Sequence, residues 1–146
     1  TCALPISLVF NAAGVGASAG HSETAAKAAK DLAAVIAFVE ASENVTPKLL
    51  GYSFGAITVL EHACSRQNLE VLLIAPVLAL GSQRLSEQAA LSGHVIVGSE
   101  DAIAQPESLS ARFGPSSVQF IEGADHFFNG YDQALARAAE AFFNGT

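Results

Sequence analysis

The fold of this chain is decided by the stretch Leu49-Leu50-Gly51-Tyr52-Ser53-Phe54-Gly55-Ala56, residues 49–56. It places a Gly-x-Ser-x-Gly pattern between a short apolar run and an apolar periodic run that continues to Leu60. This context predicts a strand, a sharp turn and a helix, with Ser53 strained at the turn and its hydroxyl group exposed above a sheet. We expect Gly51 and Gly55 to be required because strand and helix cross closely there. The alternative is a glycine-flanked loop serine without a function.

Composition bounds the class of protein. Of the 146 residues, 51% are hydrophobic and 14% charged, which suits a parallel sheet that is buried on both faces. The net charge is −7 and the seven Lys and Arg form no basic cluster, so nucleic acid and anionic membranes are poor partners.

No apolar run approaches the length of a membrane span, and the start does not resemble a secretion signal. Cys2 and Cys64 indicate neither a disulfide framework nor a metal site, and we expect a cytoplasmic location.

Apolar runs alternate with helical patterns along the chain. Strands are expected at 6–11, 46–52, 70–75, 94–97 and 118–121, and helices at 22–41, 54–66, 82–91, 106–112 and 131–143. Ser22 is the expected N-cap of the first helix. This βαβ series predicts an α/β protein with a doubly wound, mostly parallel sheet in one domain, residues 1–146.

Three residues with complementary chemistry follow predicted strands. Ser53 follows the second strand, Asp101 the fourth and His126 the fifth. Because sites in parallel sheets form at the carboxyl ends of strands, we expect these side chains to meet. Ser53 would be a nucleophile, His126 its general base, and Asp101 the group that holds the imidazole tautomer. The backbone N–H of Phe54 would form half of an oxyanion hole.

Other residues compete for two of these roles. Asp101 alone could be a turn or N-cap residue, with Glu100 its nearest rival as the acid and Asp125 a distant one. His126 alone could be a surface loop histidine. The remaining histidines are weaker candidates for the base because of their positions: His62 within a helix, His94 at a strand start, and His21 early in the chain.

A glycine-rich loop after the first predicted strand raises the hypothesis of nucleotide binding. The pattern Gly14-x-Gly16-x-x-Ala19 resembles a dinucleotide fingerprint. That fold needs an acidic residue at the end of the next strand, whereas Glu40 lies in a predicted helix. Nucleotide binding is therefore the weakest of the hypotheses.

Four segments together resemble small, capless bacterial α/β-hydrolases related to the dienelactone hydrolase group. They are Phe10-Asn11 with Gly14-Val15-Gly16 and Ser18-x-Gly20, Gly51-Tyr52-Ser53-Phe54-Gly55-Ala56, Gly98-x-x-Asp101, and Gly123-Ala124-Asp125-His126-Phe127-Phe128. The resemblance covers nearly the whole chain from Ile6 on. It implies a serine hydrolase of ester or other acyl substrates, with Ser53, Asp101 and His126 as its triad and no metal or cofactor.

The chain departs from that family in two places. Ala13 stands where the family usually has an arginine before the loop glycine. Family members also carry several strands and a helix before the segment that begins this chain, and one connection there supplies the second oxyanion-hole donor. The start, Thr1 to Ser7, resembles a translated sequencing-adapter tail of an environmental gene fragment, in which Cys2 would have no meaning. The alternative is an ordinary irregular N-terminus.

An N-terminal truncation would leave residues 6–11 about 9.6 Å from residues 46–52, because one family strand lies between them. Residues 6–11 then either stand apart with open edges or slide in to pair with 46–52. We expect four well-formed parallel strands and a doubtful fifth. An open edge also favours aggregation.

The resulting hypothesis is a serine hydrolase with an open site, because the connection 76–92 is too short for a large lid. With one oxyanion donor missing, we expect this chain to be a weak or inactive catalyst. The alternative is a non-catalytic module of the same fold that binds a small ligand or a protein partner. The discriminating contact is between Ser53 Oγ and a ring nitrogen of His126. The residues specify neither an oligomeric state nor the choice among ester, thioester and amide.

Overall fold

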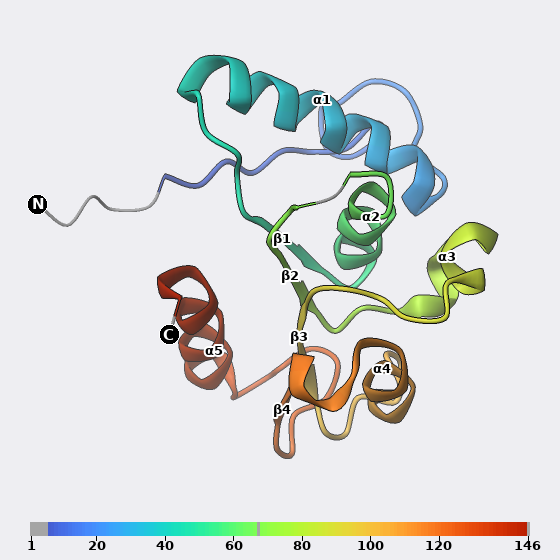
Figure 1. Ribbon diagram of the computed structural model, residues 1–146, viewed down its shortest axis with the longest axis vertical. Helices are drawn as coiled ribbons and strands as arrows, with labels where there is room; N and C mark the ends of the chain where they lie inside the picture. Colours follow the sequence, from blue (N-terminus) through green and yellow to red (C-terminus); the bar gives the residue numbers. More distant parts are fainter. Residues whose placement is uncertain (1–5, 67, 146) are drawn as a thin grey trace, which may run out of the picture.

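A computed structural model describes residues 6–66 and 68–145. The elements are α1 (Ala25–Glu43), β1 (Leu49–Tyr52), α2 (Phe54–Ala63), β2 (Val71–Ile74), η1 (Leu78–Leu80), α3 (Gln83–Glu87), β3 (His94–Gly98), α4 (Pro106–Phe113), η2 (Pro115–Ser117), β4 (Val118–Ile121) and α5 (Asp132–Asn144). Strands and helices alternate from β1 onward, as the sequence predicts. Figure 1 shows α2 and α4 on one side of the sheet and α5 on the other.

The four strands form one parallel sheet in the order β1-β2-β3-β4. All four residues of β2 and the last four of β3 are buried, whereas β1 alternates buried and exposed residues. The continuous apolar runs of the central strands fit a sheet that is covered on both faces. The predicted α/β class and the four parallel strands are therefore confirmed.

The strand expected at residues 6–11 does not form. In the described part of the chain, β1 pairs with β2 on one side only, so residues 6–11 do not pair with it. Ile6 and Val9 are each more than 90% exposed, and only Phe10 of this segment packs partly against the core. A strand needs a neighbour for its backbone hydrogen bonds, and this segment has none. Of the adapter-like start, residues 1–5, including Cys2, lie outside the described residues.

The first helix begins later than expected. Its N-cap is Thr24 rather than Ser22, and the Thr24 hydroxyl oxygen accepts a hydrogen bond from the N–H of Lys27. Ser22 instead donates to the Asp31 carboxylate, which also accepts from the N–H of Ala13 and so closes the glycine-rich loop on the helix. Because no strand precedes this loop, it lacks the strand-loop-helix context of a dinucleotide site.

Helices α1 and α2 pack against each other, and α2 also packs on β1 and β2. On α1, Leu32 and Ile36 are buried, and Val35 and Val39 are partly buried. The helix expected at 82–91 is shorter in the structure. Only the five residues of α3 are helical, and the chain after Glu87 is irregular. The remaining elements lie within a few residues of their expected bounds. None of the described helices is long and apolar enough to span a bilayer.

Candidate active site

Ser53 occupies a strained turn between β1 and α2. Its backbone has φ 52° and ψ −112°, outside the regions that a serine usually adopts. A Cβ atom on Gly51 would overlap the carbonyl group of Gly55 and lie 2.6 Å from the N atom of Ala56, so glycine is required at Gly51. Gly55 is different, because a Cβ atom there would meet nothing within 4 Å. The expectation that both glycines are required is therefore wrong for Gly55, whose backbone, not its Cβ side, faces Gly51.

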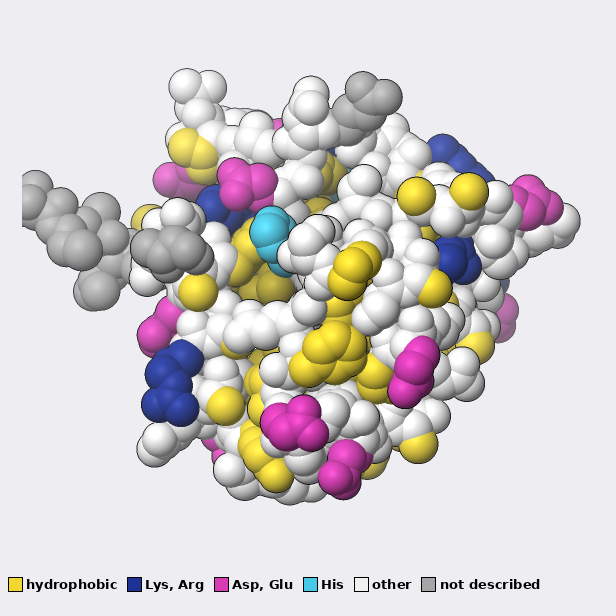
Figure 2. All heavy atoms as spheres, turned by 60° about the horizontal axis from the view of Figure 1, so that its bottom comes forward, with side chains coloured by type: hydrophobic (Ala, Val, Ile, Leu, Met, Phe, Trp, Pro, Cys, Tyr) yellow, Lys and Arg dark blue, Asp and Glu magenta, His cyan; other side chains and the backbone are white. Residues whose placement is uncertain are grey.

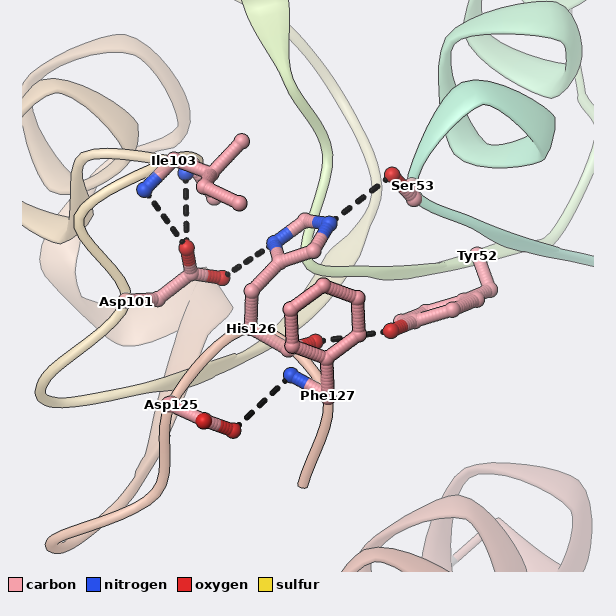
Figure 3. A network of polar contacts seen from close by, with 8 residues as sticks. Tyr52, Ser53, Asp101, Ile103, Asp125, His126 and Phe127 are labelled. Carbon is pink, nitrogen blue, oxygen red and sulfur yellow. Dashed lines mark hydrogen bonds and ion pairs between the residues drawn. The ribbon is translucent and has the colours of Figure 1, made fainter. Parts of the chain in front are cut away.

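Asp101 lies in the turn after β3 and is 1% exposed. Its Oδ1 atom accepts hydrogen bonds from the N–H groups of Ile103 at 2.9 Å and Ala104 at 2.8 Å. Oδ2 remains directed at His126 (Figure 3). One carboxylate oxygen thus stabilises the turn by accepting backbone hydrogen bonds, and the other faces His126.

His126 connects Ser53 and Asp101. Its Nδ1 lies 2.8 Å from Asp101 Oδ2, and its Nε2 lies 2.9 Å from Ser53 Oγ (Figure 3). An ionised carboxylate only accepts hydrogen bonds, so Nδ1 carries the proton and Nε2 accepts from the serine hydroxyl group. The imidazole is only 6% exposed. The contact that discriminates between the hydrolase and binding hypotheses is therefore present.

No protein-family model and no curated protein sequence matches this chain. Solved structures do match. The chain is similar to an α/β serine hydrolase without a lid from Xanthomonas campestris, with 27% identity over 93% of this chain and 63% of that one, at a TM-score of 0.71. It is also similar to an α/β serine hydrolase homologue from Coxiella burnetii, with 24% identity over 93% of this chain and 66% of that one, at a TM-score of 0.73.

The chain has the fold of the lidless α/β serine hydrolases. It spans about two thirds of the length of the two hydrolase structures. In this hydrolase fold, a nucleophilic serine occupies the strand-to-helix turn that Ser53 occupies here. The resemblance predicted from the residues is thus supported over nearly the whole chain.

None of the rival residues makes the contacts of Asp101 or His126. Asp125 directs Oδ1 to the N–H of Phe127 at 2.9 Å, away from the imidazole of His126 (Figure 3). Glu100 is exposed, and no contact joins its carboxylate to His126. The other histidines lie elsewhere: His21 beside the glycine-rich loop, His62 in α2, and His94 at the start of β3 against Phe142.

Gly98 brings the turns that carry Asp101 and His126 together. A Cβ atom on Gly98 would overlap the carbonyl group of Ala124 and lie 2.8 Å from the carbonyl oxygen of Asp125. The N–H of Glu100 donates to the carbonyl oxygen of Ala124 at 3.0 Å. The pattern Gly98-x-x-Asp101 marks this glycine in the sequence, but the pattern alone does not predict the close approach.

Exposed hydrophobic side chains lie beside Ser53, Asp101 and His126. They belong to Tyr52 and Phe54 on either side of it, Ile103 near Asp101, and Phe127 next to His126, and we call them the apolar rim. The Phe127 ring stands edge-on to the imidazole, with 5.5 Å between ring centroids. On the face that Figure 2 presents, hydrophobic side chains gather with acidic ones beside them, and Lys and Arg lie toward the margins.

Phe54 is the first residue of α2, where backbone N–H groups lack intrahelical acceptors. Its N–H is therefore available beside Ser53, at the end of the helix that favours negative charge. Within residues 6–66 and 68–145, no group of three or more His, Cys, Asp or Glu side chains is arranged to hold a metal ion.

Proposed function

We propose that the chain is an α/β-hydrolase domain that cleaves an ester or another acyl substrate with Ser53 as the nucleophile. The observation that carries this proposal is the unbroken chain of hydrogen bonds from Ser53 Oγ through His126 to Asp101. The strained backbone of Ser53 supports it, because strain at a strand-to-helix turn is typical of activated serines. The likeness to a serine hydrolase at 27% identity favours the same reaction class.

The proposed reaction has two halves. Ser53 Oγ attacks the acyl carbonyl carbon while its proton passes to His126 Nε2, and that proton then goes to the leaving alcohol. Water attacks the resulting serine ester, again giving its proton to His126, and the acid is released with Ser53 restored. Asp101 holds the Nδ1–H tautomer and stabilises the imidazolium that forms in each half.

The N–H of Phe54 is the donor that we assign to the oxyanion of both tetrahedral intermediates. We assign no second donor among the described residues. The loss of one oxyanion donor typically lowers the rate by about 10²- to 10³-fold. We therefore expect slow turnover from residues 1–146 alone, with the nucleophile still reactive.

Labelling with a fluorophosphonate probe tests the proposal, because the probe reports an activated serine even when turnover is slow. The parent chain should be labelled, and the Ser53→Ala variant should not. The matched control is Ser99→Ala, which removes a hydroxyl group that accepts from the N–H of Gly123 and does not contact His126. A circular dichroism melt on each sample shows that the labelled and unlabelled chains are folded.

A folded parent chain that does not react would contradict the proposal. In that case the non-catalytic module that binds a small ligand or a protein partner becomes the better hypothesis. Labelling that persists in the Ser53→Ala chain would show that another nucleophile is responsible and would also contradict the proposed role of Ser53.

A further inference from the structure

Tyr52 makes two different contacts with the residue that carries the imidazole. Its hydroxyl group donates a hydrogen bond to the backbone carbonyl oxygen of His126 at 2.7 Å. Its ring stacks on the imidazole ring, with centroids 5.7 Å apart and planes inclined by 29° (Figure 3). One side chain therefore fixes both the backbone and the ring plane of His126.

These contacts cross the sheet. Tyr52 ends β1, whereas His126 follows β4, and two strands lie between β1 and β4 in the sheet. Among the described residues, the hydrogen bonds that join the turn at 51–54 to the loop at 122–128 are those of Ser53 Oγ and Tyr52 Oη. Apart from the hydrogen bond between Ser53 and His126, the Tyr52 hydroxyl group thus makes the hydrogen bond that connects the two loops among the described residues.

The surroundings of the phenol keep it a donor. The pKa of Tyr52 is raised above its ordinary value by burial and then by the nearby carboxylates of Asp101 and Asp125. The proton therefore remains on the phenol over the pH range in which a histidine acts as a base. Packing supports the same geometry, because Phe128 lies against the Tyr52 ring with centroids 6.4 Å apart.

We propose that Tyr52 is a positioning residue for His126, holding the imidazole at the distance from Ser53 Oγ that proton transfer requires. This inference rests on the proposed hydrolase function and deepens it. The hydrogen bond from Tyr52 holds the backbone of His126 in place, and misplacement of a base slows proton transfer. Loss of the hydroxyl group should therefore slow the reaction of Ser53 without unfolding the chain.

The test compares Tyr52→Phe with the matched variant Tyr131→Phe in the full 146-residue chain. These are the two tyrosines of the sequence, and no hydrogen bond joins the Tyr131 hydroxyl group to His126. We expect the second-order rate constant of fluorophosphonate labelling to fall about two- to tenfold in Tyr52→Phe and to stay within twofold of the parent in Tyr131→Phe. Tyr52→Leu, which also loses the stacked ring, should be slower than Tyr52→Phe.

A second readout does not depend on reactivity. In a ¹⁵N-labelled chain, the Nδ1–H proton of His126 should give a slowly exchanging signal that broadens or exchanges faster in Tyr52→Phe but not in Tyr131→Phe. If the parent chain does not react with the probe, the proposed function fails while this signal still decides the positioning role. The inference is overturned if Tyr52→Phe leaves the His126 signal unchanged, or if its labelling rate equals that of Tyr131→Phe.

Discussion

The backbone of Gly51 lies so close to the carbonyl group of Gly55 that no Cβ atom fits between them. The approach is one-sided, because a Cβ atom on Gly55 points into open space. The turn that presents Ser53 therefore depends on one of its two glycines.

This asymmetry predicts opposite effects for two alanine substitutions. Gly51→Ala should destabilise the fold by about 1–3 kcal/mol, because the added methyl group overlaps backbone atoms that cannot move aside. Gly55→Ala should leave stability unchanged or raise it by up to about 1 kcal/mol, since Gly55 has helical geometry in α2 and alanine favours helix. Urea unfolding followed by circular dichroism measures both. Equal losses in the two variants would contradict the one-sided approach.

The second prediction concerns the acid. Asp101→Asn keeps an oxygen for the N–H groups of Ile103 and Ala104, but it turns an amide N–H₂ toward His126 Nδ1 and favours the wrong tautomer. We expect the labelling rate to fall by orders of magnitude, up to about 10⁴-fold, with little change in stability. The control is Glu100→Gln, whose side chain is exposed. Similar rates for Asp101→Asn and the parent would remove Asp101 from the proposed triad.

The third prediction concerns substrate charge. The apolar rim carries no cation, and the field of Asp101 and Asp125 is strong enough to contribute to the raised pKa of Tyr52. A neutral aryl ester such as p-nitrophenyl butyrate should therefore react about five- to tenfold faster than p-nitrophenyl hemisuccinate, whose carboxylate is repelled. Added salt should narrow the ratio.

Asp125→Asn offers a sharper form of the same experiment. Asparagine keeps the acceptor for the N–H of Phe127 while it removes the charge. The preference for the neutral ester should shrink in this variant. A preference that is absent from the parent chain, or that is the same in both chains, would show that the field at the site does not select the substrate.

The fourth prediction is a pH dependence of stability that arises away from the site. His62 Nε2 is buried and has no hydrogen-bond partner among the described residues. Burial lowers the pKa of His62, and the charge of Arg66 lowers it further, with Glu40 acting in the opposite direction. The unfolded chain therefore binds a proton more readily than the folded one. Neutral His62 therefore makes its full contribution to the free energy of unfolding above about pH 6.5, the pKa of an unperturbed histidine. That contribution is lost as the pH falls toward the lower pKa of His62 in the folded chain.

Thermal unfolding at pH 7.5 and pH 5.5 measures this effect. The melting temperature of the parent chain should fall between the two values, and His62→Leu should show a smaller fall. His21→Gln serves as the control because His21 is exposed. The prediction is wrong if the melting temperatures of His62→Leu and of the parent chain fall by the same amount between pH 7.5 and pH 5.5.

Much of the fold and the site followed from the residues. The apolar runs at 71–74 and 95–98 could be recognised as strands because a strand covered on both faces has no polar positions. The meeting of Ser53, Asp101 and His126 could be predicted because each follows a parallel strand, and the carboxyl ends of parallel strands lie at one edge. Local chemistry also favoured the turn at Ser53.

Other features could not be predicted because they depend on how the chain packs in three dimensions. Residues 6–11 have the composition of a strand but lack a partner. Thr24 rather than Ser22 is the N-cap, and Ser22 donates to Asp31 instead. Glycine is required at Gly51 but not at Gly55 because of the way the strand and the helix cross. The Gly-x-Ser-x-Gly pattern is symmetric and does not show this difference.

The order of strands and helices and the type of each group at the strand ends are properties of the local sequence, because backbone preference and side-chain chemistry are local. Long-range packing sets the contact between Asp101 and His126, and it brings Tyr52 to join the turn of Ser53 to the loop of His126. Those contacts depend on side-chain directions and distances of a few ångströms across the sheet. Such distances are set by how the strands pack, and packing involves every element at once.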